Sequence, residues 1–490
     1  MIKLWMNELK YENDVRALIM AFYHGEKIIV NPGSEVLNPD TVCLCEMRID
    51  FFVNRLFVSL RDTASEKRVS DWGATVFEDY KQTKNDLKRL VYKVLCAFTG
   101  RTLPWGTLTG IRPTKISMQL LDEGYSDKQM RDFFEREYKI SDAKYRLCTT
   151  VAENERRILK DIDYQKGFSL YTGIPFCPTI CAYCSFSSYP LGIWKDKVDD
   201  YLDALSKEIE AVSSMFGGRV KPLTFYMGGG TPTSLNARQM DRILTKLEQC
   251  FDLDNVCEKT IEAGRPDSIT ADKLKAIRDH GITRISINPQ TMNQKTLDAI
   301  GRRHTVTQVK EAYALARSLG FDNINMDLIA GLPGETVEDF MYTLDEIRKM
   351  APESLTVHAL AIKRAALVNR EKLYLQSASV DDVNTMINLA FETTSDMGLV
   401  PYYLYRQKNI AGNLENVGYA KPGLEALYNI LIMEEKQSIV ALGAGGSTKI
   451  VHHDENRIER IENVKSVKDY IERIDEMILR KNNHLTSIKM

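Results

Sequence analysis

The 490-residue chain contains no run of about 18 apolar residues, which is the length that a membrane-spanning helix needs. Its first residues, Met1-Ile-Lys-Leu-Trp, lack the charged and then apolar layout of a secretory signal peptide. Basic and acidic residues nearly balance, at 65 against 67, so no excess of positive charge would attract nucleic acid. These absences predict a cytoplasmic protein that acts on a small molecule and inserts into no membrane.

The nine cysteines are irregularly spaced, which is not typical of a disulfide framework. Six of them are isolated, and we expect structural roles for them: Cys43, Cys45, Cys96, Cys148, Cys250 and Cys257. The other three form the motif Cys177-x3-Cys181-x2-Cys184, directly after a strand-like run.

Three thiolates can hold three irons of a [4Fe-4S] cluster and leave the fourth iron open to a small molecule. Electron-transfer clusters use four cysteines, and structural zinc sites use four ligands. The spacing therefore predicts Cys177, Cys181 and Cys184 as cluster ligands. The alternatives are a structural zinc completed by a distant histidine, or three buried thiols that happen to lie close together.

Strand-like and helix-like patterns alternate after residue 165. The predicted strands are residues 169–174, 223–227, 259–263, 284–288, 323–329 and 354–361. The predicted helices between them include residues 198–216, 237–251, 307–319 and 337–350. The alternation indicates an α/β fold with a parallel sheet, either doubly wound or an incomplete (β/α)6 barrel, and the pattern alone does not separate the two.

The flanking segments have a different character. Residues 1–165 predict a separate α+β domain of unknown role, with strand-like runs at 27–30, 41–45 and 51–60 and a helical pattern at 82–97 that closes at Gly100. Residues 166–400 form the predicted barrel. Residues 401–490 form a mixed C-terminal segment with an aromatic cluster and a basic helical tail.

Polar and glycine motifs follow the ends of the predicted strands. Gly228-Gly229-Gly230-Thr231 follows the second strand, where glycines let the backbone approach a ligand closely. Glu262 ends the third strand, and its carboxylate can accept hydrogen bonds from ribose hydroxyls. Arg302 offers a fork of donors suited to a carboxylate, and Asp327 lies on the fifth strand. Chemistry in such barrels sits at the carboxyl ends of the strands, so we expect these groups to converge.

In order and spacing, these motifs resemble the oxygen-independent coproporphyrinogen III oxidases (coproporphyrinogen dehydrogenases) of the radical S-adenosylmethionine (SAM) superfamily, over roughly residues 165–365. The stretch 402–423 is similar to the HemZ branch of that family. The resemblance implies an incomplete (β/α)6 radical SAM barrel with an N-terminal α+β domain and a C-terminal mixed extension. It also implies a [4Fe-4S] cluster whose open iron binds SAM.

The resemblance assigns the remaining site residues by position. Tyr171, Gly229 and Glu262 would bind the cluster-bound SAM. The positions of a second SAM, whose presence stays open, are Tyr183, Gly230, Thr231, Gln290, Arg302, Asp327 and Ala361. Two positions depart from the family pattern: Phe186 replaces a fourth cysteine, as in the haem-chaperone branch, and Lys449 aligns with an apolar residue.

The implied reaction is oxidative decarboxylation of coproporphyrinogen III to protoporphyrinogen IX in haem biosynthesis, initiated by a 5′-deoxyadenosyl radical and driven by a reductant such as flavodoxin or ferredoxin. The tetra-anionic tetrapyrrole substrate would need basic clamps, for which the candidates are Arg112, Lys115, Arg303, Lys363, Arg364, Arg406 and Lys408. One alternative is a haem-binding chaperone, with His304, His358, His452 or His453 as axial ligand. Another is a radical SAM enzyme with a different substrate.

Overall fold

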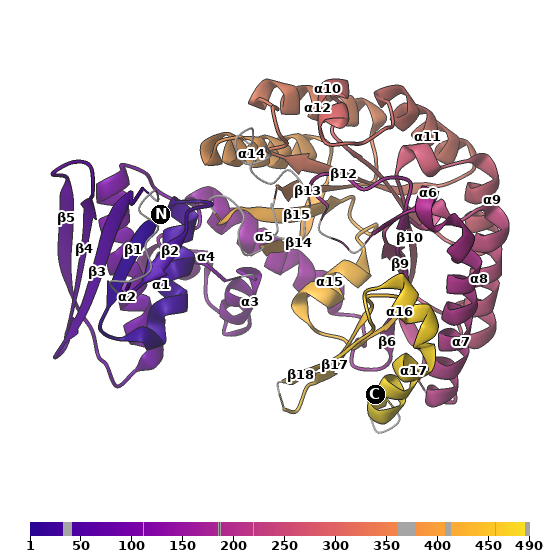
Figure 1. Cartoon of the computed structure of the whole chain (residues 1–490), viewed down its shortest axis with the longest axis horizontal. Coiled ribbons are helices and arrows are strands. Elements are labelled where there is room, and N and C mark those ends of the chain that lie inside the picture. Colours follow the sequence, from indigo (N-terminus) through magenta and orange to yellow (C-terminus); the bar gives the residue numbers. More distant parts are fainter. Residues whose placement is uncertain are drawn as a thin grey trace. The chain divides into compact units, whose positions relative to one another are not determined.

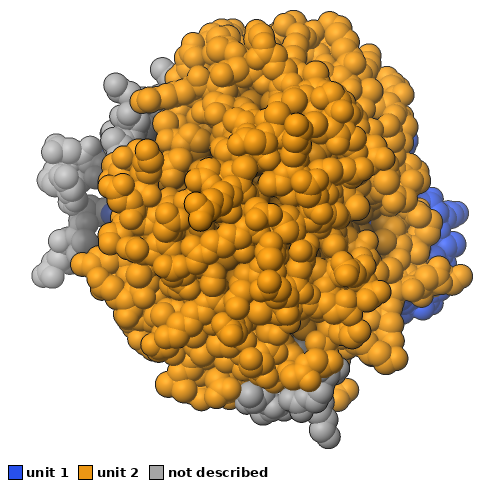
Figure 2. All heavy atoms as spheres, turned by 90° about the vertical axis from the view of Figure 1, so that its right-hand side faces the viewer, with its two compact units in different colours: residues 1–152, 405–415 blue, residues 153–404, 416–490 orange. Residues whose placement is uncertain are grey.

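The computed structural model describes residues 1–32, 42–110, 112–184, 186, 188–218, 220–360, 378–406, 413–455 and 457–485. The chain forms two compact units, which Figure 2 colours separately. Unit 1 contains residues 1–152 and 405–415, and unit 2 contains residues 153–404 and 416–490. The division into domains at residues 165 and 400 stays a prediction.

Unit 1 contains a five-stranded sheet in the order β2-β1-β3-β4-β5, whose last three strands form an antiparallel meander. The helix α2 begins after Asp79, whose side chain accepts a hydrogen bond from the backbone of Gln82, and ends at Gly100 in the left-handed conformation, as predicted. The elements are β1 (Ile2–Met6), α1 (Glu12–Phe22), β2 (Ile28–Val30), β3 (Cys45–Phe52), β4 (Arg55–Asp62), β5 (Arg68–Ala74), α2 (Tyr80–Thr99), α3 (Thr114–Asp122), α4 (Asp127–Tyr138) and α5 (Asp142–Leu159).

Two strand predictions in this unit are wrong in detail. Of the run predicted at 41–45, residues 42–44 are not in a strand, although Leu44 donates its backbone N–H to the carbonyl of Met1. The run at 51–60 is not one strand but a hairpin between β3 and β4. Asn54 has a positive φ of 58° there, which turns the chain and which the alternation of apolar residues could not reveal.

Unit 2 contains six parallel strands that neighbour one another in chain order, β6-β9-β10-β11-β12-β13. A doubly wound sheet reverses its strand order in the middle, so this order identifies the fold as a barrel. The barrel is incomplete because β6 pairs instead with β16 and β13 pairs with β15. The strands are β6 (Phe168–Ile174), β9 (Pro222–Gly229), β10 (Glu258–Gly264), β11 (Arg284–Gln290), β12 (Asn323–Ala330), β13 (Ser354–Ala359), β14 (Val400–Arg406), β15 (Glu415–Ala420) and β16 (Ile439–Leu442).

Helices cover the outer face of the barrel strands (Figure 1). The predicted bounds of α7 and α12 match the structure, and α12 starts at a capping box between Thr336 and Asp339. The barrel helices are α7 (Val198–Phe216), α8 (Ala237–Cys250), α9 (Ala271–Asp279), α10 (Gln294–Ala299), α11 (Val306–Ser318), α12 (Val337–Met350) and α14 (Val380–Asp396). The short elements are η1 (Leu9–Tyr11), β7 (Phe176–Cys177), β8 (Tyr189–Pro190), α6 (Leu191–Trp194), η2 (Lys195–Lys197), η3 (Pro232–Ser234) and η4 (Pro266–Ser268).

The C-terminal segment packs against the first β/α unit of the barrel through a buried polar cluster, here called the Glu208 seam. Glu208 of α7 is fully buried and accepts hydrogen bonds from Lys481 Nζ at 2.6 Å, the Tyr470 hydroxyl at 2.6 Å, the Gly443 backbone at 2.8 Å and Asn463 Nδ2 at 2.8 Å. The remaining elements of the C-terminal segment are α15 (Leu427–Glu434), β17 (Ser447–His452), β18 (Arg457–Glu462), α16 (Val467–Glu472) and α17 (Ile474–Leu485).

Among the helices that the structure describes, none combines the length and the apolar composition needed to cross a membrane.

Candidate cofactor site at the carboxyl ends of the barrel strands

The predicted cysteine ligands lie in the loop that follows β6. Cys177 and Cys181 are buried, and Cys184 is half-buried. Burial raises the pKa of the Cys177 thiol to about 11, and the charges of Cys181 and Cys184 also raise it, so the three sulfurs are electrostatic neighbours. No group of three potential ligands converges on a single-ion position within the described ranges. The loop therefore gathers three thiols without forming a ready-made mononuclear metal site.

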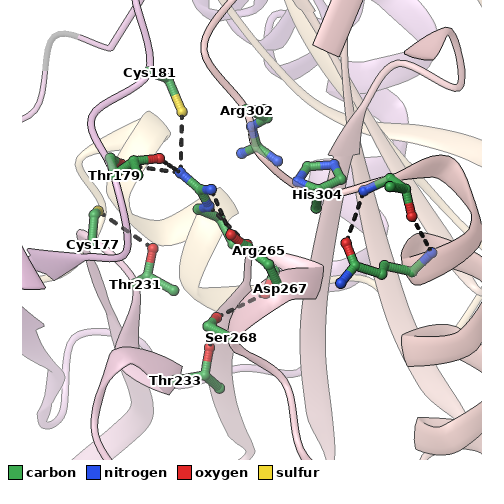
Figure 3. Close-up of polar contacts among 12 residues, drawn as sticks. Cys177, Thr179, Cys181, Thr231, Thr233, Arg265, Asp267, Ser268, Arg302 and His304 are labelled. Carbon is green, nitrogen blue, oxygen red and sulfur yellow. Dashed lines mark hydrogen bonds and ion pairs between the residues drawn. The ribbon is translucent and has the colours of Figure 1, made fainter. Parts of the chain in front are cut away.

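The glycine motif packs directly against this loop. Thr231 Oγ1 lies 3.4 Å from Cys177 Sγ, and the Thr231 backbone donates to the carbonyl of Phe176 at 2.8 Å (Figure 3). A Cβ added to Gly230 would lie 2.7 Å from the Phe176 oxygen and 3.0 Å from the Cys177 sulfur. Only glycine fits this close approach between the second strand and the first.

The carboxylate of Glu262 faces a group of tyrosines. The Tyr226 hydroxyl donates to Glu262 Oε1 at 2.5 Å, and the Tyr226 ring stacks on Tyr428 with 4.5 Å between centroids. Tyr171 lies in the same near-parallel group, 6.3 Å from Tyr226. Desolvation raises the pKa of Glu262 to about 7, and the like charge of Asp327 contributes to the rise, whereas the hydrogen bond from Tyr226 and the charge of Arg284 oppose it. Glu262 is therefore a half-buried carboxyl whose pKa lies near neutral pH.

A second polar group lies on β11, β12 and β13. Asn325 donates to Asp327 Oδ1 at 2.8 Å and to Ser286 Oγ at 3.0 Å. His358 Nε2 lies 4.0 Å from Asp327 Oδ2. Asp327 also acts electrostatically on Glu262, so the structure brings these two predicted residues together. His358, a candidate haem ligand, therefore lies beside a predicted SAM residue.

Gln290 ends β11 in a left-handed conformation with φ of 70°, which is uncommon for a residue other than glycine. Its side chain is buried, and within the described part of the chain its Oε1 has no hydrogen-bond partner. Arg302 is also buried and donates to the carbonyl of Asn288, and its guanidinium interacts with Tyr183 and Cys181. Gln290 therefore presents an unfilled acceptor two positions after Asn288, whose carbonyl accepts a hydrogen bond from the buried Arg302.

The remaining histidine candidates differ in position. His304 is buried beside Arg302 (Figure 3), and burial and the charge of Arg302 lower its pKa to about 4. His452 bonds Glu459 on the neighbouring strand at 3.2 Å, and His453 is exposed. Phe186, in place of a fourth cysteine, is 73 % exposed.

Among the basic clamp candidates, Arg406 is buried in unit 1, over the Trp105 ring at 5.0 Å and donating to the carbonyl of Leu108. Its guanidinium is engaged in packing rather than presented to a substrate. Arg112 and Lys115 belong to unit 1, and Arg303 is exposed on unit 2. The predicted residues Ala361, Lys363, Arg364 and Lys408 lie outside the described residues.

Sequence reasoning missed three residues that the structure places in this site: Tyr226, Arg265 and Tyr428. Arg265 follows the strand that carries Glu262, and its guanidinium reaches the cysteine loop (Figure 3). Tyr226 precedes Gly228 by two positions, and this strand periodicity is a signal that could have placed it on the face of the glycine motif. No local pattern could have found Tyr428, which is about 200 positions away.

The comparisons with known proteins agree with this arrangement. The model of the radical SAM superfamily matches residues 171–347. The oxygen-independent coproporphyrinogen-III oxidase-like protein HemZ of Bacillus subtilis (strain 168) is 44 % identical over 84 % of this chain and 83 % of its own length. The chain belongs to the HemZ-like branch of the radical SAM superfamily. Its family is that of the oxygen-independent coproporphyrinogen III oxidases.

Other relatives of this HemZ-like chain carry two different names. The haem chaperone HemW of Bacillus subtilis is 30 % identical over 63 % of this chain and 76 % of its own length. The oxygen-independent coproporphyrinogen III oxidase of Salmonella typhimurium is 28 % identical over 64 % of this chain and 66 % of its own length. The structure of HemN from Escherichia coli superposes with a TM-score of 0.53 at 24 % identity, covering 66 % of this chain and 73 % of that one, and shows a shared fold.

The cofactors of this family are a [4Fe-4S] cluster and SAM. The residues present fit both groups. Three neighbouring thiols supply soft ligands for iron, and the glycine motif leaves room that any Cβ would fill. The unfilled acceptor on Gln290, with φ in a strained region, is the kind of group that a polar ligand satisfies.

Proposed function

We propose that the protein catalyses the oxygen-independent oxidative decarboxylation of coproporphyrinogen III to protoporphyrinogen IX. The observation that carries the proposal is the convergence of the three-thiol loop, the glycine motif and Glu262 at the carboxyl ends of the barrel strands. This site occurs in a chain that is 44 % identical, over 84 % of its length, to a coproporphyrinogen-III oxidase-like relative.

In this proposal Cys177, Cys181 and Cys184 hold the cluster, and Tyr171, Gly229 and Glu262 contact the SAM bound to it. Replacement of Cys181 by alanine should abolish the cluster signal in anaerobic absorption and spin-resonance spectra. A full signal in that variant would exclude the three-ligand assignment. Cys257→Ala is the matched control, because this thiol is exposed and lies outside the loop.

A second SAM would be held by Tyr183, Gly230, Thr231, Gln290, Arg302, Asp327 and Ala361, of which Ala361 lies outside the described residues. The unfilled Gln290 acceptor and the buried Arg302 guanidinium support a polar ligand that carries a carboxylate group, as SAM does. Equilibrium dialysis of the reconstituted protein would count the bound SAM. One molecule per chain would limit the proposal to the cluster-bound site.

The cluster held by Cys177, Cys181 and Cys184 and the SAM bound to it would supply the chemistry for taking a hydrogen atom from a propionate side chain. The overall conversion of each propionate to a vinyl group would release CO2 and pass one electron to an external electron acceptor. The chain's own contribution is to fix geometry and exclude water. Tyr226 orients the Glu262 carboxylate, and the tyrosine group closes that side of the site with apolar ring faces.

A haem-binding chaperone is the second candidate function. Relatives named haem chaperones match this chain at 26 to 30 % identity, and Phe186 replaces the fourth cysteine. His358, beside Asp327, would be the axial ligand to test. Replacing His358 by alanine should remove haem binding if this candidate is right.

The deciding experiment is an anaerobic assay of reconstituted protein with SAM, a reductant such as flavodoxin and coproporphyrinogen III. Protoporphyrin and 5′-deoxyadenosine are followed together. Multiple turnovers of both products establish the decarboxylase. Deoxyadenosine without protoporphyrin refutes it and favours the chaperone or another substrate.

A further inference from the structure

The loop that carries the three cysteines is tied to the third barrel strand by Arg265. This residue follows β10 and is only 3 % exposed. Its NH1 group donates to the carbonyl of Thr179 at 3.0 Å and to the Thr179 hydroxyl at 2.6 Å. The same group lies 3.9 Å from Cys181 Sγ. One buried guanidinium therefore contacts both the backbone of the loop and one of its thiols (Figure 3).

An ion pair with Asp267 fixes the orientation of the Arg265 side chain. Arg265 Nε and NH2 donate to the two carboxylate oxygens of Asp267 at 2.9 and 2.7 Å. The carbonyl of Arg265 also accepts from the Ser268 hydroxyl at 2.8 Å. A bidentate ion pair of this kind holds the planar fork in one orientation. Lysine could keep the charge here but could not make both sets of contacts.

Asp267 compensates the buried charge of Arg265 only in part. Taking a guanidinium out of water is unfavourable, and one carboxylate does not offset this penalty fully when a second buried guanidinium lies close by. That second cation is Arg302, whose interaction with Cys181 and Tyr183 is given above. Two arginines against a single aspartate leave a net positive charge around Cys181. Deprotonated thiolates of a cluster would compensate that charge.

We infer that Arg265 is a positioning residue that holds the cysteine loop in place and raises the reduction potential of the cluster through its contact with Cys181. This inference rests on the cluster ligands of the proposed function, but not on the substrate. A positive charge or an N–H donor near a ligand sulfur stabilises the more negative, reduced cluster. The neighbouring Asp267 has the opposite effect because its charge offsets that of the guanidinium.

The test uses three variants of the full-length reconstituted protein and one control. Arg265→Gln removes the charge, Arg265→Lys keeps the charge without the fork, and Asp267→Asn removes the offsetting carboxylate. Arg238→Gln, an exposed position on α8, makes the same change in net charge away from the loop. Iron and sulfide content and the midpoint potential from an anaerobic spin-resonance titration are measured without any tetrapyrrole.

We expect a lower midpoint potential in Arg265→Gln, a higher one in Asp267→Asn, and a wild-type value in Arg238→Gln. Arg265→Lys should keep a potential closer to wild type but contain less iron. A purely structural role would not shift the potential in opposite directions. Wild-type potential and iron content in Arg265→Gln would overturn the inference, as would shifts of the same sign in Arg265→Gln and Asp267→Asn.

If Arg265→Gln holds no cluster, Asp267→Asn decides the question. A raised potential in that variant supports the inference, and an unshifted potential overturns it. Absence of a cluster in the wild-type protein would instead count against the three-cysteine assignment. Failure to decarboxylate coproporphyrinogen would leave the measured potentials unaffected, so the two failures are distinguishable.

Discussion

Two glutamates of unit 2, the buried Glu208 and the half-buried Glu262, differ in the partners that surround them. Glu208, in the seam with the C-terminal segment, has a buried lysine at 2.6 Å and three further donors. Glu262, at the carboxyl ends of the strands, has one tyrosine donor and a neighbouring aspartate of like charge. A carboxylate with a direct ion pair and several hydrogen-bond donors stabilises a fold, whereas one with a single donor keeps acceptor positions for a ligand. The number of direct partners that each carboxylate has therefore distinguishes the structural role of Glu208 from the proposed functional role of Glu262.

Breaking the seam should have the largest effect on stability. Lys481→Met removes the buried cation and leaves the Glu208 charge uncompensated, which should lower the free energy of unfolding by about 3 to 5 kcal/mol. Lys468→Met, at an exposed position, is the control. Urea denaturation measures both. A loss below about 1 kcal/mol would mean that the seam does not depend on its ion pair.

The charge of Glu262, unlike that of Glu208, should lower the free energy of unfolding. Its pKa of about 7 lies above the usual 4.5, so the folded state holds the proton more tightly than the unfolded state. The free energy of unfolding should therefore fall as pH rises from about 4.5 to about 7, by at most about 3 kcal/mol. Glu262→Gln should remove this dependence, and Glu338→Gln, on the exposed side of α12, should retain it. Equal slopes in all three proteins would contradict the raised pKa.

The two glutamate sites should also differ in their effect on SAM affinity. Glu262→Gln should weaken SAM binding by about 2 kcal/mol, or about thirtyfold, while the cluster stays intact, because an amide replaces two strong acceptors. Lys481→Met should leave the SAM affinity of the folded protein unchanged. Calorimetric titration of SAM into each reconstituted variant measures this. Unchanged affinity in Glu262→Gln would refute its assigned contact.

The smallest expected effect belongs to Tyr226. Tyr226→Phe keeps the ring stack but removes the hydrogen bond that orients Glu262, and should weaken SAM binding by about 1 kcal/mol, or about fivefold. Tyr428→Phe is the matched control, since it preserves both the stack and the Tyr226 bond. Equal affinities in the two variants would show that the Tyr226 hydroxyl does not position the carboxylate.

The sequence could predict much of the barrel because its signals are local. Helical periodicity gives the bounds of α7 and α12, and glycine and threonine mark helix ends. The pattern at 51–60 predicts one strand and hides the hairpin, because the chain turns at Asn54 without glycine or proline. Alternation of strands and helices also left the barrel and the doubly wound sheet undecided, because strand order is a property of tertiary pairing.

By itself, the sequence determined the three-cysteine spacing, the glycine motif and the strand ends that carry Glu262 and Asp327, because each depends on neighbours within a few residues. Only the tertiary structure decided how distant segments complete the site. It brought Arg265 to Thr179 across 86 positions and placed Tyr428 against Tyr226. Such contacts join residues that lie far apart in the sequence and meet only when the chain folds, so no local pattern predicts them.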